Sequence, residues 1–268
     1  MNALLRRILS RNTTHNRDLS NIEKLHRDLK KGLRVPDLET VIIDYFNHPR
    51  WEIRNTAVKA AGESGIVAFV PLLCRFMTDR KQKGFIRRNA ATALKSFRGN
   101  SKEIMPALMR AVWDDYWEVR SQAALTIAEI AEPDETIEME LIRRLFRTSP
   151  SIIHHLPYFF PLRVYRERDF EVRAALTRAL GAVAITPSTL HVLELLTGDS
   201  FWQVREAAIQ SLFRCAPSMG VSIMDLLLTL QDLDLTCPDF RPKFPIRETW
   251  NRLKNGVSVS TDTNHGTH

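Results

Sequence analysis

The chain has 268 residues, of which 44% are hydrophobic and 26% are charged, and this ordinary globular composition excludes a mainly disordered or a collagen-like protein. The formal net charge is +7, but residues 1–34 carry nine basic and three acidic side chains, so +6 of it lies there and the rest of the chain sums to +1. The three cysteines are far apart and form no Cys-x-x-Cys pair, which argues against a disulfide framework and against a zinc site.

A basic N-terminal segment comes first, over residues 1–19. It holds four arginines and no acid before Asp18, with apolar residues at helical steps, a pattern that predicts an amphipathic helix. Such a start is also typical of a mitochondrial transit peptide, or of a helix that docks on an anionic membrane or an acidic partner. Because basic residues continue to Arg34 and no cleavage site is evident, we expect an intracellular protein of the cytoplasm or nucleus, with mitochondrial import less favoured.

One helical pair is predicted next, over residues 20–31 and 37–46, from the recurrence of apolar residues. Ser20 and Glu23 have the spacing of a capping box at the start of the first helix. A folded array is expected from residue 20 to residue 254. The polar tail 255–268 shows little periodicity and is expected to be disordered.

Five segments then share one pattern, in which an aromatic or apolar residue and an arginine precede small and apolar residues at three- and four-residue steps. The intervals between the five arginines are 33, 33, 53 and 32 residues, long enough for two helices and two turns. Second helices are expected over residues 66–77, 102–112, 136–146, 188–197 and 221–230. The signature residues are Trp51, Arg54, Arg87, Trp117, Arg120, Phe170, Arg173, Trp202 and Arg205.

This aromatic-x-Val-Arg-x-x-Ala pattern resembles the HEAT repeat, in the short form also found in phycobilisome-lyase-like proteins, over about residues 37–230. The resemblance implies an all-α fold, a right-handed α-solenoid of about five to six HEAT-like helix pairs. It also implies that the repeat arginines join a ladder with acids near the turns, for which the candidates are Asp115, Asp169 and Asp199. The first two repeats lack an acid at that spacing, and Gly84 stands where the other repeats have Trp or Phe.

The aromatic and arginine signature has two interpretations. A row of aromatic residues and cations is able to bind nucleic acid or an acidic partner. Because the spacing follows the period of the fold, we instead expect packing between repeats. On this view Trp117, in the central repeat, is buried between neighbours on both sides.

The long interval contains an insertion at residues 147–168, with three prolines, paired histidines and four aromatic residues. Its apolar side chains are too many for a freely solvated loop, so it either covers the groove of the stack or contacts a partner. The candidate contact residues are Ile153, Tyr158, Phe159 and Phe160.

No catalytic motif and no metal-binding motif is found. His191 and Glu194 form at most a single half-site, and His-Glu dipeptides, which hold iron in a HEAT-repeat hydroxylase, are absent from the sequence. We therefore predict a non-catalytic protein–protein interaction scaffold that needs no cofactor and no metal. The alternatives are a helper subunit of a bilin lyase and a HEAT-like nucleic-acid-binding protein, and the near-neutral charge of residues 35–268 disfavours the second.

Overall fold

The computed structural model describes residues 3–33, 36–147, 165–222 and 225–226. These residues are almost entirely helices and turns, with one isolated antiparallel bridge between Phe146 and Tyr165. The predicted all-α fold is therefore confirmed. The predicted contact residues Ile153, Tyr158, Phe159 and Phe160 lie outside the described residues, as do the tail 255–268 and most of the helix expected over 221–230.

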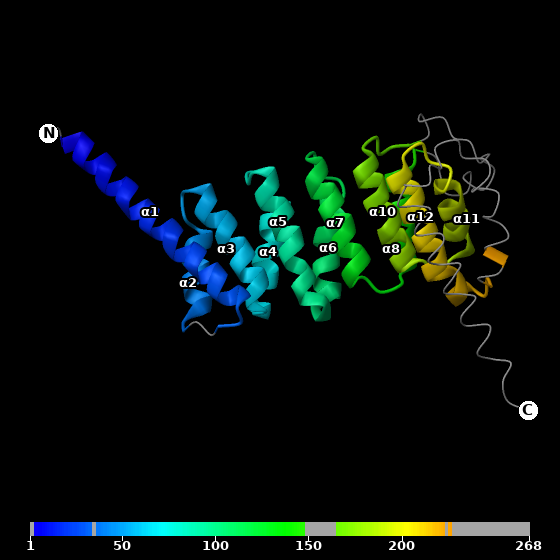
Figure 1. The fold of residues 1–268 in the computed structure, drawn as a ribbon, viewed down its shortest axis with the longest axis horizontal. Coiled ribbons are helices and arrows are strands. Elements are labelled where there is room, and N and C mark those ends of the chain that lie inside the picture. The colour runs from blue at the N-terminus through cyan, green and yellow to red at the C-terminus, as the bar shows by residue number, and fades with distance from the viewer. Residues whose placement is uncertain (1–2, 34–35, 148–164, 223–224, 227–268) are drawn as a thin grey trace, which may run out of the picture. The chain divides into compact units, whose positions relative to one another are not determined.

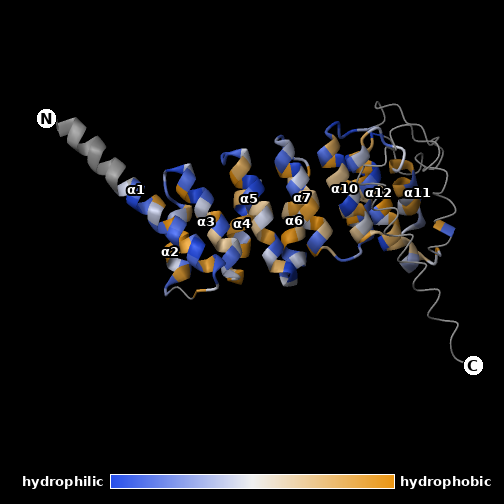
Figure 2. Cartoon of the chain, in the orientation of Figure 1, coloured by the Kyte–Doolittle hydropathy of each residue, from blue (hydrophilic) through white to orange (hydrophobic). Residues whose placement is uncertain are grey.

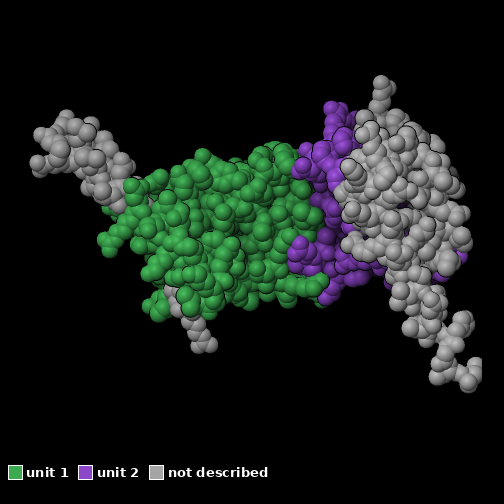
Figure 3. Space-filling model, viewed as in Figure 1, with its two compact units in different colours: residues 1–126 green, residues 127–268 purple. Residues whose placement is uncertain are grey.

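The chain divides into two compact units, residues 1–126 and residues 127–268 (Figure 3). Helix α7, Trp117–Ile130, begins in the first unit and ends in the second.

The first unit is built from two rows of helices (Figure 1). Helices α1, α3 and α5 pack side by side in one row, while α2 packs on α3, and α4 packs on both α5 and α6. The bounds are α1 Ala3–Lys30, α2 Leu38–Phe46, α3 Trp51–Ser64, α4 Val70–Thr78, α5 Gly84–Leu94 and α6 Ser101–Ala111, with short 3-10 helices η1 Val67–Phe69 and η2 Lys95–Asn100.

Small residues set the separation within the first row. In α3 the buried face is formed by Ile53 and by alanines at positions 57, 60 and 61, and each helix carries both apolar and polar residues along its length (Figure 2). A Cβ atom on Gly62 would lie 2.7 Å from the Cβ of Ala93 and 2.9 Å from its Cα. Helices α3 and α5 therefore touch almost backbone to backbone at this point.

The second unit repeats the arrangement. Helix α10 packs on α8 and α12, and α11 packs on α12. The side chains of Asp134 and Asp169 accept hydrogen bonds from backbone N–H groups at the starts of α8 and α10, which satisfies donors that a helix start leaves open. The bounds are α8 Glu135–Leu145, α10 Phe170–Val183, α11 Pro187–Leu196, α12 Trp202–Cys215 and η4 Ala216–Met219.

The expected capping box at Ser20 is wrong. Helix α1 runs without a break from Ala3 to Lys30, so Ser20 lies exposed in its middle and caps nothing. The helix ends just before Gly32, whose φ of 73° is left-handed. The backbone N–H of Leu33 then donates to Asp28 O over 3.0 Å, as is typical of a glycine-terminated helix.

Candidate functional site

The five signature arginines make the same hydrogen bonds near the starts of their helices. In each case Nη1 donates to main-chain carbonyls five or six residues earlier, which fastens the preceding turn to the helix. The bonds run from Arg54 to His48 and Pro49 (2.7 and 2.8 Å), from Arg87 to Gln82 (2.5 Å), from Arg120 to Asp114 and Asp115 (3.0 and 3.1 Å), from Arg173 to Glu167 and Arg168 (3.4 and 2.9 Å), and from Arg205 to Asp199 and Ser200 (2.9 and 3.3 Å).

The other side of the guanidinium reaches forward to the next turn of the chain. Arg87 forms a two-bond pair with Asp114, at 2.9 and 2.6 Å, and Arg173 forms one with Asp199, at 3.0 and 3.1 Å. Both pairs are buried. Each such arginine thus ties its own turn to the following one, 26 or 27 residues further on.

The predicted ladder partners are therefore partly wrong. Asp115 pairs with Arg80 at the surface, and Asp169 caps α10. Asp199 does join the ladder, but its carboxylate is bound by Arg173. The second repeat, expected to lack an acid, uses Asp114, because the partner follows the arginine by almost one repeat instead of preceding it.

The first and the last of the five signature arginines in the sequence differ from Arg87 and Arg173. At Arg54 the forward partner is the amide of Gln82, at 3.3 Å, so this contact is a neutral hydrogen bond. At Arg205 the Nε atom is buried and has no hydrogen-bond partner in the described part of the chain.

Aromatic side chains follow the same edge. In the first unit Trp51 meets Phe85 edge to face, with ring centroids 4.8 Å apart, and the Nζ atom of Lys83 lies 4.6 Å from the Trp51 ring. In the second unit Phe170 and Phe201 stack at 4.6 Å. These contacts join successive turns within each unit.

Trp117 departs from the expectation that it is buried between neighbours. Its exposed fraction is 36%, and Trp113 in the turn just before it is 38% exposed. The turn between α6 and α7 therefore presents two tryptophans to solvent. Tryptophan is highly buried on average, and it is enriched among the residues that dominate binding energy at protein interfaces.

The two ends of the insertion are held together in the second unit. Phe146 and Tyr165 stack at 5.3 Å in the isolated bridge, and Arg144 forms a buried ion pair with Glu167. The guanidinium of Arg173 lies 4.6 Å from the Tyr165 ring. Burial, and then the carboxylate of Asp199, raise the pKa of the Tyr165 hydroxyl.

The described residues offer little for covalent or metal chemistry. They contain no cluster of three or more His, Cys, Asp and Glu side chains able to hold a metal ion, and His191 Nδ1 lies 3.8 Å from Glu194 Oε2. Burial raises the pKa of the Cys74 and Cys215 thiols to about 11, which suppresses their nucleophilic thiolate forms. Across the same residues, every helix is too short or too polar to span a membrane.

Stacked helix pairs fastened by one recurring arginine define the chain as an α-helical repeat protein. The family model of the HEAT repeat matches residues 104–132, the region of α6 and α7, and this match supports the repeat type predicted from the sequence. The comparison with curated proteins finds no match. The matched residues include the α6–α7 turn, with Trp113 and Asp114, and Trp117 at the start of α7.

Proposed function

We propose that the protein is a non-catalytic scaffold that binds another protein through the turn between α6 and α7. The observation that carries this proposal is the exposure of Trp113 and Trp117, 38% and 36%, which lie within one short turn and at the helix start that follows it. Removing two large aromatic surfaces from water gives an interface much of its free energy, at little cost in side-chain entropy.

The structure of the turn supports this role. Asp114 is buried and paired with Arg87, and its carboxylate accepts from the backbone N–H of Tyr116 at 2.8 Å. The Arg120 guanidinium also donates to two carbonyls of the turn. The turn is therefore fixed before a partner arrives, which lowers the entropy cost of binding.

The equivalent turn between α4 and α5 provides an internal comparison. It carries polar and charged residues at positions 79–83, and its Arg80 side chain pairs with Asp115. In both turns a signature arginine donates to main-chain carbonyls of the turn, an arrangement that we call the arginine framework. The two turns differ in exposed aromatic surface. The arginine contacts thus belong to the fold, whereas Trp113 is additional to them and Trp117 is a signature residue that stays exposed.

Affinity capture with variants tests the proposal. The double variant Trp113→Ser/Trp117→Ser should lose specific captured proteins by at least about fivefold, because interface aromatics dominate binding energy. Val67→Ser, which alters a residue that is 52% exposed in η1, should retain them. Equal capture by the wild type, the double variant and the control would show that the tryptophan turn is not the binding surface.

A further inference from the structure

A second feature of the first unit is a groove between α1, α3 and the segment that joins α5 to η2. Its volume is about 430 Å³. Its floor lies where Gly62 and Ala93 bring α3 and α5 into contact, so the groove follows a line of close helix approach. It is lined by residues from the later parts of α3 and α5, whereas the arginine ladder lies at their starts.

Three lysines from three elements line this groove. Lys30 comes from α1, Lys59 from α3 and Lys95 from η2, and only Glu63 among the lining residues is acidic. The formal charge of the lining is therefore three minus one, or +2. Helix α1, which forms one wall, also belongs to the N-terminal region that carries +6 of the chain's charge.

The pKa of His26 reflects its burial and the charges around it in the groove. Its Nε2 atom lies 4.0 Å from Glu63, yet its pKa is lowered from 6.5, first by burial and then by the nearby charges of Lys30 and Lys59. The lysines thus outweigh the carboxylate at this point. An anion entering the groove gains favourable electrostatic energy.

We propose that this groove binds an acidic peptide segment of a protein partner. The lysine ammonium groups meet acidic side chains, and Glu63 accepts N–H groups of the peptide backbone. Asn89 also lines the groove, and its Nδ2 atom donates to Asn55 Oδ1 at 2.7 Å, which holds the Asn89 side chain in place.

The same features favour a peptide over a nucleic acid. The phosphodiester backbone presents acceptors but no N–H donor for Glu63, whereas a peptide backbone presents an N–H group at nearly every residue. Nucleic-acid binding also calls for a row of cations along several phosphates, whereas three lysines line this groove. The groove is positively charged, and its volume suits a short peptide segment.

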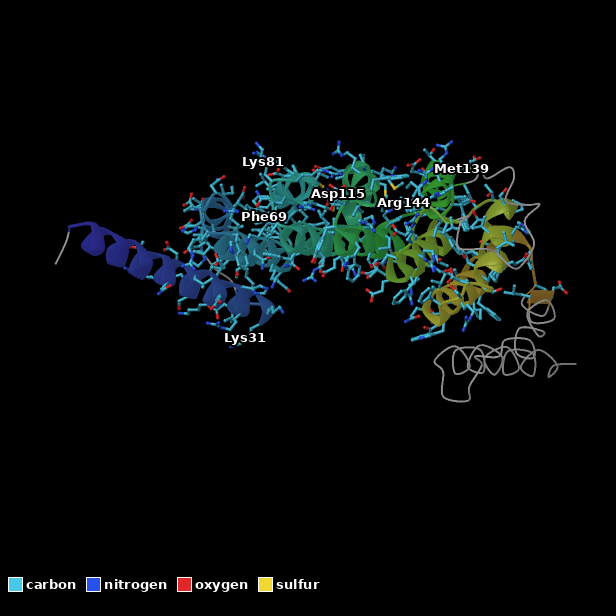
Figure 4. The ribbon with its side chains drawn as sticks, turned by 90° about the horizontal axis from the view of Figure 1, so that it is seen from above. Lys31, Phe69, Lys81, Asp115, Met139 and Arg144 are labelled. Carbon is cyan, nitrogen blue, oxygen red and sulfur yellow. The ribbon has the colours of Figure 1, made fainter. Side chains whose placement is uncertain are left out.

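Fluorescence anisotropy with the full chain tests this assignment. The probe is a labelled alternating Glu-Ser peptide, and a labelled oligothymidine of the same net charge is the comparison. Lys59→Glu should weaken peptide binding by at least about tenfold, because it reverses the charge of one of the three lysines that line the site. Lys81→Glu makes the same charge change and serves as the control. Figure 4 shows Lys81 on the opposite side of the first unit from Lys31, the neighbour of the groove residue Lys30 in the chain. This variant should weaken peptide binding by less than about twofold.

Two further readouts distinguish a site from general attraction to a basic protein. Bound peptide should raise the pKa of His26, followed by NMR, and the wild-type chain should bind the peptide more tightly than the oligothymidine. The proposal is overturned if the peptide does not bind, if both lysine variants weaken it equally, or if the oligonucleotide binds more tightly. The inference adds a second surface to the proposed scaffold, and its failure would leave capture through Trp113 and Trp117 unaffected.

Discussion

Tyr116 explains why one repeat carries glycine where the others carry an aromatic residue. A Cβ atom at Gly84 would lie 2.3 Å from Cδ1 of the Tyr116 ring, so that ring already occupies the space. Phe85 makes the contact with Trp51 instead. The aromatic character of the edge is retained, but it is shifted by one residue and shared with the following turn.

Restoring the aromatic residue at this position should therefore destabilise the protein. Gly84→Trp is expected to lower the free energy of unfolding by about 1–3 kcal/mol, the usual cost of overpacking, as measured by urea denaturation. The double variant Gly84→Trp/Tyr116→Ala should recover part of the loss. A more stable single variant would show that the Tyr116 ring moves aside without cost.

The arginine ladder separates buried from exposed ion pairs at the residue scale. Arg173 and Asp199 are both fully buried, so Arg173→Ala leaves a carboxylate without its cation and should cost about 3–5 kcal/mol. Arg80→Ala removes a pair whose side chains are 59% and 82% exposed and should cost less than about 1 kcal/mol. Urea midpoints that shift equally would contradict the assigned roles.

At the scale of helices, close packing depends on particular small residues. Gly62 faces Ala93 across α3 and α5, and Gly181 faces Ser211 across α10 and α12, where an added Cβ would lie 2.3 Å from the Ser211 Cβ. Ser211 Oγ also donates to the carbonyl of Thr177 at 3.1 Å. These contacts explain why the helices of each row approach so closely.

Alanine substitution at Gly62 tests this packing, because we expect it to lower the free energy of unfolding, whereas Gly→Ala usually raises it. In an open helix interior, Gly→Ala stabilises by about 0.8–1 kcal/mol. At Gly62 we expect a loss of about 1–3 kcal/mol, because the new methyl group meets the Ala93 backbone. Gly99→Ala, where nothing lies within 4 Å of the added Cβ, is the control and should change the Tm little.

The sequence predicts these helices well because their apolar residues recur regularly. The helices expected over 102–112 and 136–146 are observed as Ser101–Ala111 and Glu135–Leu145. The sequence pattern wrongly predicts a new helix at residue 20, inside the continuous helix α1. Ser20 and Glu23 have the spacing of a capping box, but that spacing also occurs within a continuous helix. Local patterns thus give helix type more reliably than helix ends.

The candidate sites were harder to predict, because they depend on distances between repeats. Lys30, Lys59 and Lys95 meet only after α1, α3 and α5 have packed together. The pairing of Arg87 with Asp114 required knowing that the guanidinium reaches the next turn, not its own. The exposure of Trp117 depends on which neighbours cover it, and the sequence period alone does not specify them.

At the scale of the whole molecule, the repeated framework and the residues added to it have separate roles. The arginines, buried pairs and small residues recur in both units and account for the stack. Trp113 and the lysine-lined groove do not recur with that period, and Trp117 is a signature residue that stays exposed. For this reason we assign partner binding to Trp113, Trp117 and the groove, and structural stability to the arginines, the buried pairs and the small residues.

Amide hydrogen exchange of the full chain, with and without a captured partner, tests most directly whether partner binding and structural stability belong to different residues. The account predicts that the partner slows exchange in the α6–α7 turn, residues 112–118, and leaves the equivalent α4–α5 turn, residues 79–83, unchanged. Because the two turns share the arginine framework, they differ mainly in their exposed tryptophans. Equal protection of the two turns, or protection of neither, would contradict the claim that the protein binds through its tryptophan turn.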